Sequence, residues 1–237
     1  MLKDRQKSIL DAVVREYIKT AKPVASKELA KEFPLEISSA TIRNEMLKLD
    51  TSGYLEQPYI SAGRIPTDKG YRFFVDHLTP EASLNIKEEE LLDEVFGVRA
   101  EDEFVKEFGK IISRISGIFT AVGMFEDDIF YETGFSELLE EPEFGEPAYM
   151  KAFGQMLDLL DEKIAVLVEK RSIRDGEIFI GGENPLKEAR AYSMIVASWK
   201  HPRGFSGFFT MIGPKRTNYY QHKAILRSVG ARKNHER

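Results

Sequence analysis

Two side chains in the segment SSATIRNEMLKLD, residues 38–50, have the chemistry to read the edges of DNA bases. Arg43 offers a guanidinium fork that matches guanine, and Asn44 offers an amide that matches adenine, the pairings that distinguish bases in the major groove. A second guanidinium, Arg64, stands in the polar stretch YISAGRIPT, residues 59–67. We expect it alone at the tip of a loop, where it can enter a minor groove or hold a phosphate.

Short helices are predicted ahead of that loop, and they must position these side chains. Apolar residues at spacings of three and four predict a first helix over residues 4–20. Ser26 is expected to cap a second helix that Pro34 stops, and Ser38 is expected to cap a third helix over residues 39–52. The third helix therefore has one apolar face for packing and an opposite face free for contacts.

Helix, helix, turn, helix, strand, loop and strand, in that order, are typical of a winged helix-turn-helix. The third helix then enters the major groove by its N-terminal end, where small residues allow close approach and backbone N–H groups can hold a phosphate. The loop over residues 58–66 becomes the wing, and its glycine lets the backbone come close to DNA. The residues expected to contact DNA are Ser38, Ser39, Ala40, Thr41, Arg43, Asn44, Lys48, Ser61, Gly63, Arg64 and Thr67.

A simpler interpretation exists for each part of this pattern. The segment at residues 38–50 could be an ordinary amphipathic helix, and the stretch at residues 59–67 an ordinary surface turn. Winged helices also serve as protein-binding modules. The two segments in this order and at this spacing nevertheless favour DNA binding over the simpler interpretation.

Residues 23–76, PVASKELAKEFPLEISSATIRNEMLKLDTSGYLEQPYISAGRIPTDKGYRFFVD, also resemble a known family. They are similar to the DNA-binding domain of HrcA, the bacterial heat-shock repressors that bind an inverted repeat upstream of chaperone operons. The resemblance extends over about residues 4–78. The segments SELLEEPEF, IFIGGENPL and FFTMIGPKRTNYYQHKAIL resemble parts of the family's C-terminal domain, which has a GAF-like fold.

The resemblance implies an α+β chain with three parts: a winged helix-turn-helix over residues 1–78, a linker over residues 79–90 and a GAF-like domain over residues 91–237. Family members carry roughly another hundred residues, a dimerising insertion within the GAF-like domain, at the scale of a small domain. Here little separates ISGIFTAVGMFED from FYETGFSELLEEPEF, so the insertion is expected to be absent.

The pattern of the second domain predicts an antiparallel sheet with helices on its faces. We expect a helix over residues 103–122, a hairpin around the acidic residues 126–128 and a helix over residues 148–171. Strands near residues 177–181, 191–199 and 205–213 and a helix over residues 218–228 follow. The helix over residues 103–122 either packs on its own sheet or meets a second chain. We place the dimer contact there, at Phe104, Phe108 and Ile111.

Aromatic residues on the predicted strands allow two interpretations. Tyr192, Trp199 and Phe209 could line a small-ligand pocket, but strand aromatics of this kind more often form a packed core. No cofactor is expected. The four histidines have no metal-ligand spacing, and no nucleophile or phosphate-binding motif is present, so no metal site and no catalytic site are predicted.

Charge and composition limit the class of protein further. The chain has 237 residues, no cysteine and a net charge of −5. Residues 1–78 carry a net charge of +2, residues 79–171 carry −14 and residues 172–237 carry +7, so an anionic partner is expected to meet the two ends. No signal peptide or membrane span is expected, which together with the missing cysteines favours the cytoplasm.

Two functional classes remain. The first is a homodimeric, sequence-specific repressor of heat-shock genes on an inverted-repeat operator in double-stranded DNA; the resemblance implies help from the GroE chaperonin. The second is a winged-helix regulator or adaptor controlled by a small ligand in the GAF-like domain. Arg43, Asn44 and Arg64 favour the repressor, because a protein-binding surface has no need of base-reading forks beside a cationic wing.

Overall fold

The computed structural model divides the chain into two compact units. The first comprises residues 1–78 with 215–217, and the second comprises residues 79–214 with 218–237. The structure describes residues 2–32, 37–78, 83–125, 129–160, 164 and 176–233. Pro34, the acidic residues 126–128 and most of residues 161–175, on which several expectations depend, lie outside the described residues.

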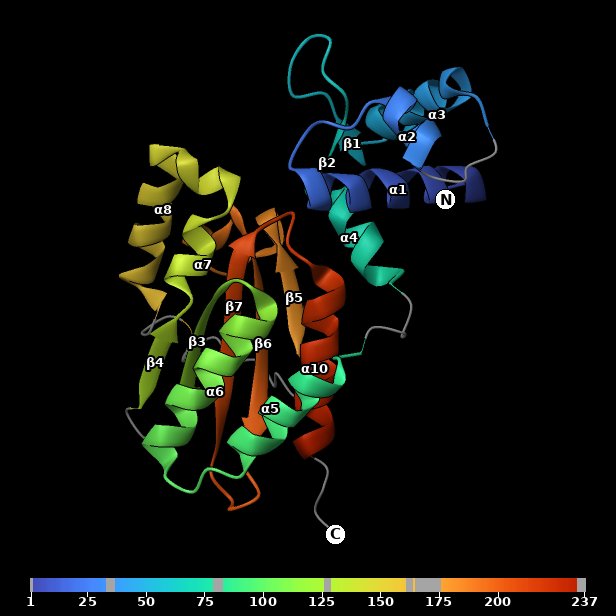
Figure 1. The fold of residues 1–237 in the computed structure, drawn as a ribbon. Coiled ribbons are helices and arrows are strands. Elements are labelled where there is room, and N and C mark those ends of the chain that lie inside the picture. Colours follow the sequence, from blue (N-terminus) through green and yellow to red (C-terminus); the bar gives the residue numbers. More distant parts are fainter. Residues whose placement is uncertain are drawn as a thin grey trace. The chain divides into compact units, whose positions relative to one another are not determined.

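The first unit is a winged helix-turn-helix (Figure 1), as the sequence predicts. Two short strands pair in antiparallel fashion, Leu55 opposite Pro66, and the loop between them forms the wing. Its elements are α1 (Asp4–Thr20), α2 (Ser26–Glu32), α3 (Ser39–Thr51), β1 (Leu55–Glu56), β2 (Ile65–Pro66) and α4 (Asp68–Asp76).

The helices of this unit pack because each has one apolar face. Val13 of α1 and Ile42 of α3 are fully buried, and Leu29 of α2 closes the same core. Ser38 caps α3 as predicted: its Oγ accepts a hydrogen bond from the Thr41 backbone N–H at 3.2 Å. The cap fixes where α3 begins and therefore which of its residues face outward.

The second unit is built on one five-stranded antiparallel sheet of order β4-β3-β7-β6-β5. Helix α6 packs on β3 and β4, and α10 packs on β6. The predicted antiparallel sheet with flanking helices is confirmed. Its main elements are α5 (Ile86–Phe96), α6 (Glu101–Ser116), β3 (Phe119–Met124), β4 (Phe130–Thr133), α7 (Phe135–Leu139), α8 (Pro147–Leu157), β5 (Glu177–Ile180), β6 (Tyr192–Lys200), β7 (Ser206–Pro214) and α10 (Tyr219–Lys233), with short 3-10 turns at Pro142–Gly145, Gly181–Glu183 and Lys187–Ala189.

Helix α6 differs from the prediction in its length and its role. It ends at Ser116 rather than at residue 122, because Gly117 adopts a left-handed conformation, φ 71°, and donates its N–H to Ser113. The chain that follows becomes β3, at the centre of the sheet. The apolar pattern continued past the helix because a buried strand and a helix face are equally apolar.

The dimer contact expected on α6 is wrong. Phe104 and Phe108 have no exposed surface: their rings stack 5.3 Å apart, and Phe104 lies 4.9 Å from the ring of Trp199. Ile111 is partly buried against the same core. These side chains hold α6 on its own sheet, so they are not available to a second chain.

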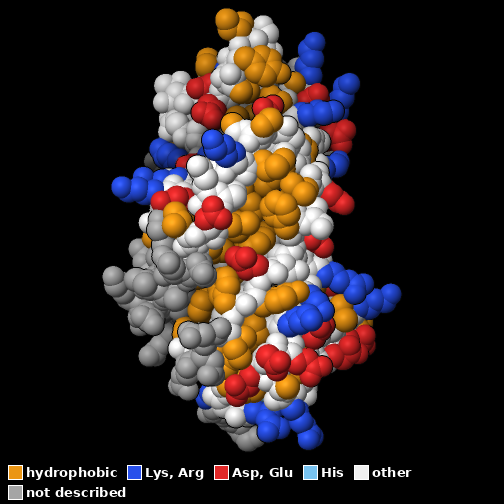
Figure 2. All heavy atoms as spheres, turned by 90° about the vertical axis from the view of Figure 1, so that its left-hand side faces the viewer, with side chains coloured by type: hydrophobic (Ala, Val, Ile, Leu, Met, Phe, Trp, Pro, Cys, Tyr) orange, Lys and Arg blue, Asp and Glu red, His pale blue; other side chains and the backbone are white. Residues whose placement is uncertain are grey.

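Exposed apolar side chains of the second unit lie on other helices. Phe135 and Leu139 of α7 and Met150 of α8 are exposed. Figure 2 shows hydrophobic side chains gathered on this side of the molecule. Any apolar contact with a partner would therefore find more accessible area here than on α6.

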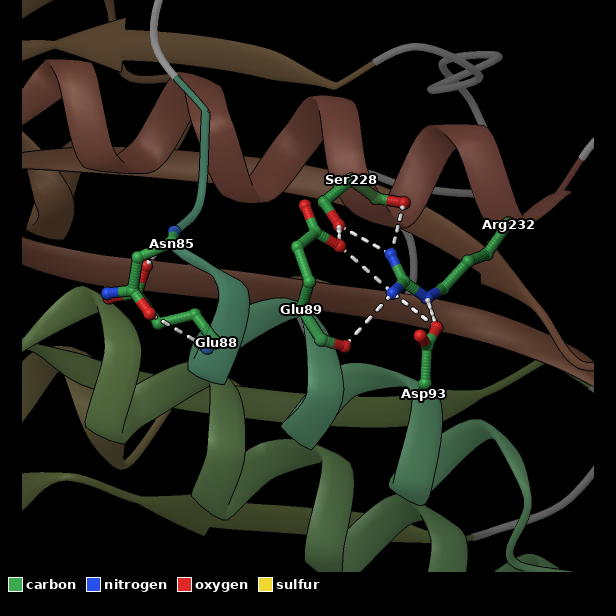
Figure 3. Close-up of polar contacts among 6 residues, drawn as sticks. All are labelled: Asn85, Glu88, Glu89, Asp93, Ser228 and Arg232. Atoms are coloured by element: carbon green, nitrogen blue, oxygen red, sulfur yellow. Dashed lines mark hydrogen bonds and ion pairs between the residues drawn. The ribbon is translucent and has the colours of Figure 1, made fainter.

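Helix α5 begins at Ile86, inside the segment expected to be a linker. Asn85 and Glu88 form a reciprocal cap at its start, with hydrogen bonds of 3.1 and 2.8 Å. Further along, Arg232 of α10 lies 2.9 Å from the carboxylate of Glu89 and also pairs with Asp93 (Figure 3). A capped helix whose acidic face is paired in this way belongs to the folded unit.

The aromatic strand residues form a packed core, the interpretation favoured above. Tyr192, Trp199 and Phe209 are buried. The Trp199 indole N–H donates to the Phe208 carbonyl at 3.0 Å, and the Tyr192 hydroxyl donates to the Tyr149 carbonyl at 2.8 Å. Burial raises the pKa of Tyr192 to about 12. Their polar groups are thus engaged by the protein's own backbone.

Candidate nucleic-acid interface

The outward side of α3 carries the two predicted base-reading side chains. Arg43 and Asn44 are exposed, while Ile42 and Met46 on the other side of the helix are buried. Among the described residues Arg43 has no ion pair or hydrogen bond, so its guanidinium is available. The helix therefore presents a guanidinium and an amide, side by side, on a backbone whose register the core fixes.

The outward side of α3 also has apolar members: Ala40, which the sequence predicts as a DNA contact, and Leu47, which the predicted set of contacts does not include. Ala40 is exposed one turn before Asn44, and Leu47, one turn after Arg43, is 56% exposed. Residues three and four apart lie on one face of a helix. Small apolar groups on a recognition helix can contact the thymine methyl group. The outward face of α3 thus combines the polar side chains of Arg43 and Asn44 with the apolar side chains of Ala40 and Leu47.

The N-terminal end of α3 brings the predicted small residues together. Ser38 and Ala40 are exposed, and Ser39 and Thr41 are half-buried. The hydroxyl of Ser38 lies 3.0 Å from that of Thr41 and caps the helix, so part of its hydrogen-bonding capacity is already used. What remains open at this end is small side chains and the positive end of the helix dipole, both suited to a phosphate.

Lys48 is exposed but has a partner on its own helix. Its Nζ lies 2.7 Å from the carboxylate of Glu45, which is largely buried. The hydrogen bond from Lys48 lowers the pKa of Glu45 despite the burial of the carboxyl group. Lys48 can still reach a phosphate, but it must share its charge with Glu45.

The expectation that Arg64 stands alone at the tip of the wing is wrong. Arg64 lies at the base, where its backbone N–H and carbonyl each pair with Val24 at 2.9 Å. Its side chain is only 16% exposed, and its Nε lies 2.6 Å from the carboxylate of Asp50 on α3. The contact is an ion pair without the angle of a good hydrogen bond, since Nε has no hydrogen-bond acceptor in the described structure. The guanidinium joins the wing to α3.

Gly63 and Thr67 also serve the fold of the wing rather than an exposed surface. A Cβ atom at Gly63 would lie 2.3 Å from the Val24 carbonyl oxygen, so the glycine is needed for contact with the protein's own backbone. The Thr67 hydroxyl donates to the Gly53 carbonyl at 2.7 Å and accepts from the Gly70 N–H at 3.2 Å. Both positions make internal contacts that shape the wing.

The tip of the wing is formed by Tyr59, Ile60 and Ser61, and the first two were missed. Tyr59 is 65% exposed and Ile60 93% exposed. The tip is a closed turn, in which the Ala62 N–H donates to the Tyr59 carbonyl at 3.0 Å and Ser61 adopts φ 68°. The signal was present in the sequence: two large apolar residues adjoin in a loop that has no strand pattern to bury them.

Within the described part of the chain, no group of three or more His, Asp or Glu is positioned to hold a metal ion. No described helix is long and apolar enough to cross a membrane.

Comparison with known families gives two matches that together cover most of the chain. Residues 1–78 match the model described as the winged helix-turn-helix transcription repressor, HrcA DNA-binding domain. Residues 71–222 match the HrcA protein C-terminal domain.

The curated relatives that this chain matches carry the name of the same family. A heat-inducible transcription repressor HrcA from Symbiobacterium thermophilum is 41% identical over 136 residues, 56% of this chain and 40% of the relative. Another, from Alkaliphilus metalliredigens, is 28% identical over 321 residues, 92% of this chain and 93% of the relative. The chain spans between a third and two fifths of the length of the first few relatives it matches.

A solved structure titled as that of a hypothetical protein superposes with a TM-score of 0.78 at 18% identity. It covers 98% of this chain and 98% of its own. At this identity the likeness concerns the fold alone.

Proposed function

We propose that this chain, which belongs to the HrcA family, is a sequence-specific DNA-binding repressor of heat-shock genes that acts on an inverted-repeat operator. The observation that carries the proposal is the outward face of α3, where Arg43 and Asn44 are exposed on a capped helix of a winged helix-turn-helix. The shared name of the curated relatives supports the physiological part of the proposal.

The contacts divide into two kinds. Arg43 and Asn44 read base edges in the major groove, with guanine and adenine as their partners. Backbone contacts position the helix and carry no sequence information. Ser38, Ser39, Thr41, Lys48 and Ser61 make these contacts, and Ala40 allows the close approach. Gly63, Arg64 and Thr67 act indirectly, because they hold the wing against the rest of the unit.

The proposed repressor is a homodimer, because an inverted repeat presents two half-sites and one winged helix binds a half-site weakly. The alignment with the Alkaliphilus relative spans 321 residues whereas this chain has 237, which supports the absence of an internal segment here. If that segment dimerises the relatives, the interface of this chain is smaller, and dimerisation is completed on DNA.

Three further parts of the proposal depend on the family. The protein acts in the bacterial cytoplasm, where the chromosome lies. It has no catalytic role. The GroE chaperonin assists its folding or its activity. The rival function, an adaptor that senses a small ligand in the second unit, is less well supported because Tyr192, Trp199 and Phe209 are buried and engaged internally.

Selection of DNA by the full chain tests the proposal. The protein is incubated with a pool of random duplexes, and the bound fraction is amplified and sequenced over several rounds. We expect enrichment of one inverted repeat, and binding of two chains to each duplex by sedimentation. If no sequence is enriched, the protein does not read DNA, and the adaptor function replaces the repressor. Enriched single half-sites bound by one chain would remove the dimer from the proposal.

A further inference from the structure

We propose that Tyr59 and Ile60 form an apolar DNA-contacting tip that enters the minor groove beside the half-site read by α3. The inference rests on the proposed function and adds two contact residues to it. Ile60 is 93% exposed and Tyr59 65% exposed. Figure 1 shows the wing as a loop that extends beyond β1 and β2.

The first step is that the tip is held in place. The Ala62 N–H closes the turn onto Tyr59, and the Gln57 side-chain amide donates to the Ala62 carbonyl at 3.0 Å. The base of the wing is tied to α3 by the pair of Arg64 with Asp50. Because contacts hold the loop at its tip and at its base, the apolar tip does not fold back onto the protein. It presents that tip at little further entropic cost on binding.

The second step concerns chemistry. Residues 57–63, QPYISAG, contain no ionisable side chain that charges at neutral pH. The tip therefore cannot hold a phosphate by charge, the role first expected of Arg64. Minor-groove binders use a different device, apolar side chains that press against sugars or wedge between base steps. Tyr59 and Ile60 are of this type.

The third step identifies the occupant. The wing and α3 belong to the same unit and are joined by an ion pair, so a duplex docked on Arg43 and Asn44 continues past the wing. In a winged helix the recognition helix occupies the major groove, and the adjoining groove along a duplex is the minor one. A protein partner could also cover an apolar tip, but it would have to compete with DNA for this side of the unit. That alternative is an outcome of the test.

The experiment compares Ile60→Ser with Ile86→Ser in the full chain. Ile86, 78% exposed at the start of α5, is a matched control because it is a largely exposed isoleucine in the second unit. The probe is the duplex that the unmodified protein enriches from a random pool. Affinity is measured at several salt concentrations, and hydroxyl radicals, which attack sugars from the minor groove, give the footprint.

We expect Ile60→Ser to weaken binding about tenfold, as loss of a well-buried apolar contact would. The dependence of log Kd on log salt concentration should not change, because no charge is removed. Protection flanking the half-site should disappear while protection at its centre remains. Tyr59→Phe should bind as the parent does, since the ring is kept, and Tyr59→Ser should behave as Ile60→Ser does.

Other results would overturn the inference. If Ile60→Ser and Ile86→Ser both bind and protect DNA as the parent does, the tip does not touch DNA and is free for a protein. Thermal melting of each variant excludes unfolding as the cause of a loss, and Ile60→Thr, which keeps the branched shape, repeats the test if serine lowers the melting temperature. If the unmodified protein enriches no sequence, it is the proposed function that fails, and this inference with it.

Discussion

Arg64 at the base of the wing lies 2.6 Å from Asp50 on α3. The guanidinium that the sequence predicted as a lone DNA ligand is thus paired inside the protein, with 16% of its side chain exposed, and Asp50 is itself only 30% exposed. The pair joins the two elements that must contact DNA together, so it fixes the distance between the recognition helix and the wing.

The variant Asp50→Ala tests whether Arg64 has a structural role or binds DNA directly. If Arg64 held a phosphate, removing Asp50 would release it and strengthen DNA binding. We expect no gain in DNA binding. Instead, Asp50→Ala and Arg64→Ala should each lower the free energy of unfolding of the first unit by about 1–2 kcal/mol, because each leaves a half-buried charge without its partner. A double-mutant cycle in urea unfolding should show that the two losses do not add. Tighter DNA binding by Asp50→Ala would return Arg64 to the interface.

The packing of Gly63 predicts a second effect on the wing. Gly63→Ala would place a Cβ atom 2.3 Å from the Val24 carbonyl oxygen, a contact that backbone must move to relieve. We expect a lower melting temperature for the first unit and weaker DNA binding. Gly154→Ala in α8 is the matched control, because nothing lies within 4 Å of a Cβ atom there. That variant should be neutral, or stabilising by up to about 1 kcal/mol. Equal melting temperatures for both variants would mean that the base of the wing can move enough to accept a Cβ atom at position 63.

The core position of Phe104 predicts loss of stability rather than loss of assembly. Phe104→Ala should cost about 3–5 kcal/mol, the usual range for a buried phenylalanine. Fluorescence of Trp199, the single tryptophan, reports unfolding of the second unit. The loss should be the same at low and high protein concentration. A loss that grows on dilution would instead point to an interface between chains.

Burial of His222 predicts that the second unit is weakened by acid. The ring is fully buried in α10, and burial lowers its pKa to about 4 against an ordinary value of 6.5. Because the folded pKa lies below the unfolded one, the unfolded state binds the proton more readily as pH falls from about 6.5 to about 4. Stability should drop by about 2 kcal/mol between pH 7 and pH 5. Burial lowers the pKa of His201 too, which acts in the same direction.

Urea unfolding followed by Trp199 fluorescence at the two pH values measures this drop. His222→Gln should be less stable at pH 7 but should lose much of the pH dependence. His77→Gln, at an exposed position in the first unit, should retain it. A parent protein equally stable at pH 7 and pH 5 would contradict the lowered pKa of His222, because the folded state would then take up as many protons as the unfolded state over this range.

Much of the fold could be predicted from the sequence because its signals are local. Helix α3 was bounded to within a residue because Ser38 is a strong cap and because apolar residues repeat along one face. The order of elements then identified the winged helix. Helix α6 was extended too far because the apolar run continues into β3, and only the conformation of Gly117 separates the two.

The site was harder to predict because it depends on contacts between distant residues. Arg43 and Asn44 were found from their helix face alone. The role of Arg64 depends on Asp50 and Val24, which are far from it in sequence. No local sequence pattern predicts those pairings. The apolar tip has no charged side chain to mark it as a DNA contact, and Ile60 is informative through its exposure, which only the structure shows.

The central claim is that α3 reads bases through Arg43 and Asn44. The most direct measurement is the ratio of affinities for the enriched inverted repeat and for a scrambled duplex, in the parent, Arg43→Ala, Asn44→Ala and the control Arg99→Ala, an exposed arginine of the second unit. Each of the two α3 variants should lose about 1–3 kcal/mol on the repeat while hardly changing on scrambled DNA, so the ratio falls. Arg99→Ala should leave the ratio unchanged. Ratios equal to that of the parent in both α3 variants would contradict the account.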